Sequence, residues 1–194
     1  MLSHIYPHMI MGVFLGPFGY PHVIRWISCV FLKSLWVDLF FVGLFLSTFI
    51  NRIDKKGRVS VPASFRASLT EGGHQGVVLY PSYKNNAIEG VSVDTMSDLG
   101  NRMDNNFAMF SDEHDDMATV LFGESIQLSF DENGRISLPQ QFIEFANLDG
   151  EMAFVGMGNK FQIWNPVALD AQKAAARKAV QSKKMTLPKG GCNE

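Results

Sequence analysis

The sequence predicts an α+β domain that is rich in β-strands and has pseudo-twofold symmetry. Three observations favour this fold class: a motif that occurs twice at a spacing of 77 residues, apolar residues that alternate within each copy, and segments with helical spacing between and after the copies. With 194 residues and 21.6 kDa, the chain has room for one domain or two small ones.

The first 50 residues differ from the rest, because they carry only three charged side chains, Arg25, Lys33 and Asp38. A secretory signal fits poorly, since no basic start and no small-residue cleavage site are present. A membrane or interfacial segment is disfavoured, because Lys33 and Asp38 would each cost about 2.5–3.5 kcal/mol near a bilayer centre. We therefore expect residues 1–41 to be a doubtful extension from a mis-assigned translation start, and a membrane partner to be unlikely.

The repeated motif reads DKKGRVSVP at residues 54–62 and DENGRISLP at residues 131–139. Aspartate suits the first position of a tight turn, where its carboxylate accepts from backbone N–H groups, and glycine supplies the positive φ that closes a hairpin. We expect turns at residues 54–57 and 131–134. After each turn Val59 and Val61, or Ile136 and Leu138, alternate with polar residues, which predicts a strand with one buried face.

Further elements follow in order along the chain. Each motif ends in a proline and is followed by a phenylalanine, which favours short helices through residues 69 and 148. Strands are expected at residues 77–80 and 87–90, with counterparts at 152–155 and 161–164. Apolar spacing predicts linking helices at residues 92–105 and 111–121 and a last helix at 167–180, before a frayed tail at 181–194.

The two turns differ in charge. Residues 51–66 hold five basic side chains against Asp54, whereas residues 128–143 hold Arg135 against Asp131 and Glu132. A basic hairpin on an acidic protein indicates an anionic partner, and a two-stranded ribbon fits the major groove of double-stranded DNA. The alternative is a solvated hairpin in which Arg58 and Arg135 pair with their own turn aspartates. The five basic residues of the first turn are Arg52, Lys55, Lys56, Arg58 and Arg66.

No enzyme, cofactor or metal site is expected. The run at residues 111–116 has oxygen and nitrogen ligands, but consecutive residues point around a helix, and the glycine-rich residues 72–76 lack the lysine of a phosphate-binding loop. No nucleophile with a base can be nominated, and no small-molecule substrate is evident. Cys29 and Cys192 form no disulfide framework, which favours a reducing compartment. Phe154, Phe161 and Trp164 are expected in the core or at a subunit interface.

Across residues 42–170 the chain resembles the MraZ family of bacterial transcriptional regulators, tandem members of the AbrB-like (SpoVT-AbrB) swapped-hairpin superfamily. The resemblance rests on FLS at residues 45–47, the two D-x-x-G-R motifs, FVG at 154–156 and NKFQIW at 159–164. It implies two swapped-hairpin repeats, at residues 42–92 and 122–166, that form a pseudo-twofold barrel with linking helices at 93–121 and a C-terminal helix and tail at 167–194. Family members begin near residue 45, so we expect the start at Val42, read from a GTG codon.

The resemblance also implies a function. Such proteins are cytoplasmic, nucleoid-associated and sequence-specific DNA-binding regulators, usually repressors, of the division and cell-wall gene cluster that includes their own gene. They assemble into homo-oligomeric rings on short promoter direct repeats. The implied DNA-binding residues are Arg52, Lys55, Lys56, Arg58, Arg66 and, as a secondary contact, Arg135; the turn-forming residues are Asp54, Gly57, Asp131 and Gly134. The alternatives are an AbrB-like antitoxin and a membrane-anchored interaction protein.

Overall fold

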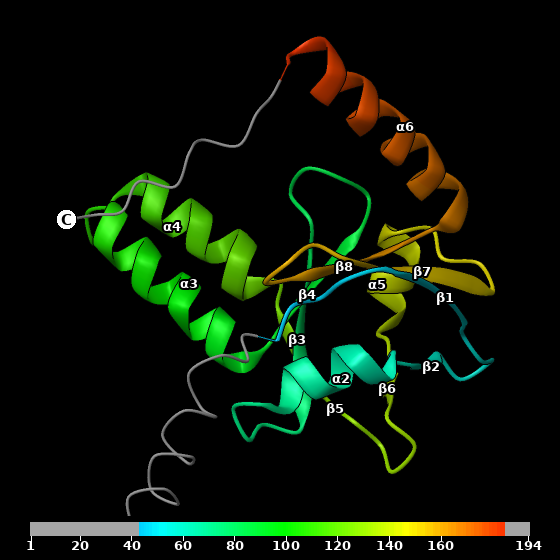
Figure 1. Ribbon diagram of the computed structural model, residues 1–194. Coiled ribbons are helices and arrows are strands. Elements are labelled where there is room, and N and C mark those ends of the chain that lie inside the picture. The colour runs from blue at the N-terminus through cyan, green and yellow to red at the C-terminus, as the bar shows by residue number, and fades with distance from the viewer. Residues whose placement is uncertain (1–42, 185–194) are drawn as a thin grey trace, which may run out of the picture. The chain divides into compact units, whose positions relative to one another are not determined.

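A computed structural model of the chain describes residues 43–184 (Figure 1). Most of the apolar opening stretch, including the whole predicted extension, and the end of the predicted tail lie outside these residues. The described elements are, in order, β1 (Thr48–Arg52), β2 (Arg58–Ser60), α2 (Ala63–Thr70), β3 (Gly76–Pro81), β4 (Ile88–Val91), α3 (Val93–Asn106), α4 (Asp112–Ala118), the π-helical turn η1 (Thr119–Gly123), β5 (Ile126–Ser129), β6 (Arg135–Ser137), α5 (Gln140–Phe145), β7 (Glu151–Gly156), β8 (Phe161–Trp164) and α6 (Pro166–Ser182).

Six strands form one antiparallel sheet in the order β1-β7-β8-β4-β3-β5, and β2 pairs with β6 in a separate ribbon. The order reads the same from either edge when the strands of the two repeats are exchanged. The first strand of each repeat pairs with the other repeat, β1 with β7 and β5 with β3, and β4 pairs with β8 at the centre. The α+β, β-rich fold class and its pseudo-twofold strand order are therefore as expected.

The predicted barrel is not confirmed. In the part of the chain that the structure describes, β1 and β5 remain the two edges of an open sheet. The strands that could have bridged these edges, β2 and β6, are three residues long and pair with each other, with Val59 opposite Ile136. The two repeats are thus tied together twice, by the central sheet and by the short ribbon.

The core gathers phenylalanine side chains of both repeats around Phe65, the first large apolar residue of α2. Its ring packs against those of Phe45 and Phe161, with centroids 5.2 and 5.3 Å away. The alternating residues Val59, Val61, Ile136 and Leu138 are buried on the same side, as the pattern predicts. Phe154 and Phe161 are buried in this core, and Trp164 is buried in a separate cluster with Leu169 of α6.

The helices lie close to their predicted positions, with one exception. The second short helix, α5, ends at Phe145 and does not continue to Leu148. Asn147 adopts a left-handed conformation with φ 47°, and Leu148 N–H donates to the carbonyl of Ile143 at 2.9 Å. This is a Schellman-type ending, in which a left-handed residue stops the helix and turns the next apolar residue into the core.

Between residues 43 and 184, no helix combines the length and the apolar character that crossing a membrane would require.

Candidate nucleic-acid interface

The first turn is held by the carboxylate of Asp54. Its Oδ1 accepts hydrogen bonds from the backbone N–H groups of Lys56 and Arg58 at 2.8 and 2.9 Å. Gly57 closes the turn with φ 77° and donates to the carbonyl of Asp54 at 2.9 Å. These hydrogen bonds and the positive φ of Gly57 give the tip of the hairpin one fixed shape.

The second turn repeats this geometry. Asp131 Oδ1 accepts from the backbone N–H groups of Asn133 and Arg135 at 2.9 and 2.8 Å, and Gly134 has φ 69°. The backbone of the two turns is therefore equivalent, and only the side chains that they display differ.

Arg58 makes a contact that its counterpart Arg135 lacks. The Arg58 guanidinium donates from Nε to Asp54 Oδ2 at 2.8 Å and reaches the same oxygen with Nη2 at 2.7 Å. Its side chain is still 40% exposed, so the remaining N–H groups face solvent. Within residues 43–184 no such ion pair is found for the Arg135 side chain. Arg58 is thus paired with its turn aspartate, and this pairing holds its guanidinium in one position at the protein surface.

The pKa of Asp54 is lowered to about 2, first by the backbone N–H of Arg58 and then by its guanidinium. A carboxyl group with a depressed pKa stabilises the fold above its unfolded pKa, here 3.8, and loses that contribution as the pH falls through about 2. We expect the carboxyl carbon of Asp54 to titrate near pH 2 by NMR, with the Lys56 and Arg58 amide signals moving in parallel. Asp54→Asn is expected to abolish this step, and a midpoint near pH 4 would show that the contacts do not form.

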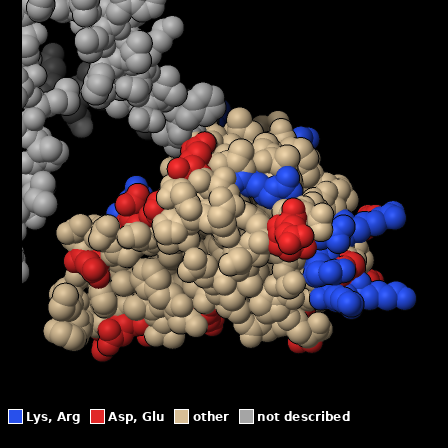
Figure 2. Space-filling model, turned by 90° about the horizontal axis from the view of Figure 1, so that it is seen from below, with Lys and Arg blue, Asp and Glu red and all other residues tan. Residues whose placement is uncertain are grey.

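The exposed basic side chains project from one hairpin. Lys55 and Lys56 are exposed at the tip of the β1–β2 turn. Arg52 is also exposed, at 84% of its side chain, although its Nε pairs with Glu151 Oε1 of β7 at 3.1 Å. Figure 2 shows Lys and Arg side chains gathered at the end of the molecule where Figure 1 places the β1–β2 hairpin. We call Arg52, Lys55, Lys56 and Arg58 the basic hairpin.

The structure places Arg66 apart from the basic hairpin. Its Nη1 donates to the backbone carbonyls of Val61 and Gly134 at 3.1 and 3.3 Å. These two residues are themselves joined, because Val61 N–H donates to the Gly134 carbonyl at 3.1 Å. Arg66 is half-buried there and links α2 to the ribbon of the two repeats, a role that the charge count alone did not reveal.

Gly134 offers a test of that link. A Cβ atom there would collide with the Arg66 guanidinium, whereas one at Gly150, which has the same φ of 69°, would meet nothing within 4 Å. We expect Gly134→Ala to lower the free energy of unfolding by about 1 kcal/mol more than Gly150→Ala, measured by urea denaturation, because the displaced guanidinium loses its hydrogen bonds. Equal losses in the two variants would mean that the strained φ, and not the Arg66 contact, sets the cost.

The basic and acidic turns lie at opposite ends of the ribbon. In the antiparallel β2–β6 pair, Arg58 stands opposite Ser137 and Ser60 opposite Arg135. Asp131, Glu132 and Asn133 are exposed beside Arg135. Arg135 therefore lies among acidic side chains and away from the basic hairpin.

The structure contains a buried carboxylate, Glu89, that the sequence did not predict. Glu89 of β4 is 3% exposed and accepts from Lys160 Nζ at 2.6 Å and Gln162 Nε2 at 2.9 Å. Burial alone would raise the pKa of Glu89, but these hydrogen bonds outweigh it and lower the pKa. Tyr80 donates its hydroxyl to Glu89 at 3.1 Å, and burial, together with the negative charge of Glu89, raises the pKa of Tyr80. A lone charge in a strand of otherwise apolar pattern was the available signal.

Among residues 43–184, no three His, Cys, Asp or Glu side chains come together in a way that could hold a metal ion. In the acidic run considered above, Ser111 instead caps helix α4 by accepting from the backbone N–H of His114 at 3.2 Å.

Comparison with known proteins gives two results. The family model described as "MraZ protein, putative antitoxin-like" matches residues 121–187. Three relatives, each named "Transcriptional regulator MraZ", align over most of the chain. The protein from Pelagibacter ubique is 44% identical over 144 residues, which is 74% of this chain and 92% of the relative. Those from Rickettsia bellii and Rickettsia rickettsii are 42% and 41% identical over 147 and 146 residues, each 75% of this chain and 97% of the relative.

Proposed function

The chain belongs to the MraZ family of transcriptional regulators, and we propose that it regulates transcription by binding double-stranded DNA through the basic hairpin, Arg52, Lys55, Lys56 and Arg58. The observation that carries this proposal is the contrast between two turns of equal backbone geometry. One displays exposed lysines and an oriented arginine, and the other displays Glu132 and Asn133 at the corresponding positions. Because the turn keeps the same backbone with two lysines or with Glu132 and Asn133, we assign the exposed lysines a role separate from the fold.

The shape and chemistry of the hairpin suit a DNA groove. A two-stranded ribbon fits into the major groove, where arginine forms bidentate hydrogen bonds with guanine and lysine contacts phosphates. Asp54 holds the Arg58 guanidinium, which reduces the entropy that binding must remove. In this assignment Lys55 and Lys56 contact phosphates of the DNA backbone. Arg58 forms hydrogen bonds with the edge of a base, and Arg52 contacts a flanking phosphate.

Arg66 and Arg135 have other roles in this proposal. Arg66 already donates to two backbone carbonyls, so it acts by fixing the ribbon on which the basic hairpin stands. Arg135 is exposed but surrounded by acidic side chains, so we assign it at most a secondary contact.

A single hairpin offers few contacts, and specific binding requires several at once. We propose that copies of the chain assemble into a ring that places basic hairpins on successive short direct repeats of a promoter. The second and later contacts are then effectively intramolecular, which raises the overall affinity without new interactions. The proposed target is the promoter of the division and cell-wall gene cluster that includes the protein's own gene, with repression as the usual outcome and the nucleoid as the place of action.

Binding of the full chain to the duplex upstream of its own gene, compared with a scrambled duplex, tests this function. We expect selective binding that Arg58→Ala abolishes and Arg135→Ala largely preserves, measured by fluorescence anisotropy at fixed salt. Loss of one base contact is expected to cost about 1–3 kcal/mol per hairpin. Equal affinity for both duplexes, or equal losses in the two variants, would contradict the assignment.

A second candidate function is that of an antitoxin that binds a partner protein, since the matching family model is described as antitoxin-like. The two functions differ in one observable. An antitoxin is expected to co-purify in a fixed ratio with a protein whose gene lies next to its own, and a promoter regulator purifies without one.

A further inference from the structure

A cavity of about 460 Å³ lies between α3, the end of α2 and the β7–β8 connection. Its wall combines Glu71 of the first repeat and Asp94 of the linking helix α3 with Lys160 of the second repeat. A volume of this size is within the range of small-molecule sites. None of these residues belongs to the basic hairpin, so the cavity is separate from the proposed DNA interface.

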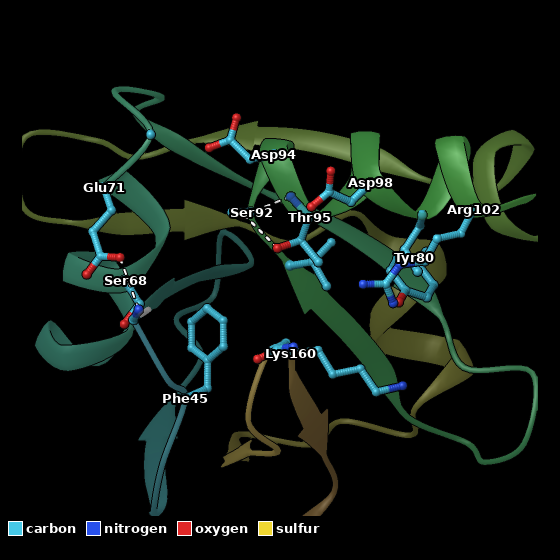
Figure 3. A pocket seen from close by; sticks show the side chains of 15 residues that line it. Phe45, Ser68, Glu71, Tyr80, Ser92, Asp94, Thr95, Asp98, Arg102 and Lys160 are labelled. Atoms are coloured by element: carbon cyan, nitrogen blue, oxygen red, sulfur yellow. Dashed lines mark hydrogen bonds between the residues drawn. The ribbon is translucent and has the colours of Figure 1, made fainter. Parts of the chain in front are cut away.

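Helix α3 lines the cavity with charged side chains whose sign changes from negative to positive along the helix. Asp94, Asp98 and Arg102 follow one another at four-residue intervals, so they lie on the same face of the helix. Figure 3 shows Glu71 and Asp94 on one side of the cavity and Arg102 and Lys160 on the other. The cavity therefore has an acidic end and a basic end.

The basic end is built on the buried carboxylate. Lys160 donates to the buried Glu89 and keeps 38% of its own side chain exposed where it lines the cavity. Because an ammonium group has three N–H donors and Glu89 takes one of them, the others are available to an anionic group. Tyr80, which also donates to Glu89, forms the wall beside it, so the position of the ammonium group is fixed by buried groups.

The acidic end carries charge that the described residues do not neutralise. Asp94 and Asp98 are like charges at i, i+4, an unfavourable arrangement on a helix. Asp94 has only His74 within ion-pair range, at 3.9 Å, and between residues 43 and 184 neither Asp98 nor Arg102 takes part in an ion pair. Glu71 is already engaged, since it accepts from the Gly43 backbone N–H at 3.1 Å (Figure 3). Asp94 and Asp98 are exposed, the Asp94 side chain to 59%, so both carboxylates are accessible to a cationic group in the cavity.

We infer that this cavity is a binding site for a small amphoteric molecule, whose ammonium group lies at Asp94 and Asp98 and whose carboxylate lies between Arg102 and Lys160. Leu99, Val91 and Phe45 supply the apolar wall along which its carbon chain packs. The helix rises about 6 Å over the four residues from Asp98 to Arg102, so a ligand that reaches both residues needs charges separated by at least about this distance.

Graded ω-amino acids test the inference on the full chain: glycine, 4-aminobutanoate, 6-aminohexanoate and 8-aminooctanoate, with hexylamine and hexanoate as single-charge controls. Binding is followed by NMR through the amide signals of Thr95, Leu99 and Lys160. We expect saturable shifts that are strongest with 6-aminohexanoate and at least about tenfold weaker affinity for hexylamine and hexanoate. Absence of saturable shifts, or equal affinity for the single-charge controls, would overturn the inference.

Substitutions of two exposed residues test the acidic end and the basic end of the site separately, without disturbing the core. Asp98→Asn and Arg102→Gln are each expected to weaken 6-aminohexanoate binding about tenfold. Their matched controls, Asp116→Asn on α4 and Lys178→Gln on α6, change the same charges away from the cavity and are expected to leave the affinity unchanged. If the controls lose as much affinity as the site variants, the effect is one of net charge and the assigned site is wrong.

Discussion

Replacing Lys55 and Lys56 together by glutamate is expected to weaken binding to the upstream duplex by at least about 100-fold at moderate salt. Both side chains are exposed at the tip of a turn whose backbone is fixed by Asp54, so the substitution changes charge without changing the fold. Loss of two phosphate contacts is also expected to reduce the slope of log affinity against log salt by about 2 per hairpin. Fluorescence anisotropy at several salt concentrations measures both quantities.

The matched control is the pair Arg177→Glu and Lys178→Glu on α6, which makes the same change in net charge on an exposed helix face. It is expected to reduce affinity only slightly, through the long-range field of the protein. A loss as large as that of the tip variant would place the DNA contact on α6 or reduce it to net charge alone.

Replacing Phe65 by alanine is expected to lower the free energy of unfolding by about 3–5 kcal/mol. Phe65 is 1% exposed, and its ring lies 5.2 to 5.5 Å from those of Phe45, Phe49 and Phe161. The loss has two parts, the burial energy of the ring and the cost of the cavity that its removal leaves. Strands of both repeats surround this cavity, so it cannot readily collapse. Urea denaturation monitored by tryptophan fluorescence measures it.

Phe110→Ala serves as the control, because this phenylalanine is 87% exposed. Its substitution is expected to change the free energy of unfolding by no more than about 0.5 kcal/mol. If the two variants were equally stable, the core would not be organised around α2 as described.

Much of the fold follows from short-range signals in the sequence. The turns at Asp54 and Asp131 were predictable because an aspartate carboxylate and a glycine with positive φ satisfy requirements that lie within five residues. The buried face of β2 and β6 followed from alternation, and the linking helices followed from apolar spacing. These features depend on local geometry, so a single sequence contains them.

The remaining features depend on residues far apart in the chain. The strand order of the sheet and the separate β2–β6 ribbon depend on pairing between the two repeats, and no local pattern shows which short strands will pair. From the sequence, Arg66 was one more basic residue near the turn. In the structure its guanidinium donates hydrogen bonds to backbone carbonyl groups of both repeats. The end of α5 was misplaced because Asn147, unlike glycine, is a weak sequence signal for a left-handed cap.

The candidate interface divides in the same way. The excess of basic residues in the first turn was evident from the sequence, but the difference between the exposed Lys56 and the paired Arg58 required coordinates. The cavity beside α3 was not predicted, because Lys160 at its basic end is held by Glu89, which lies 71 residues away in the chain.

The central claim is that one of two equivalent hairpins contacts DNA, and an NMR titration of the isotopically labelled full chain with the upstream duplex tests it most directly. The account predicts that shift changes and line broadening concentrate on the amide signals of Arg52, Lys55, Lys56 and Arg58, and that those of Asn133 and Arg135 in the second turn change little. Changes of equal size in both turns, or changes confined to the second, would contradict it.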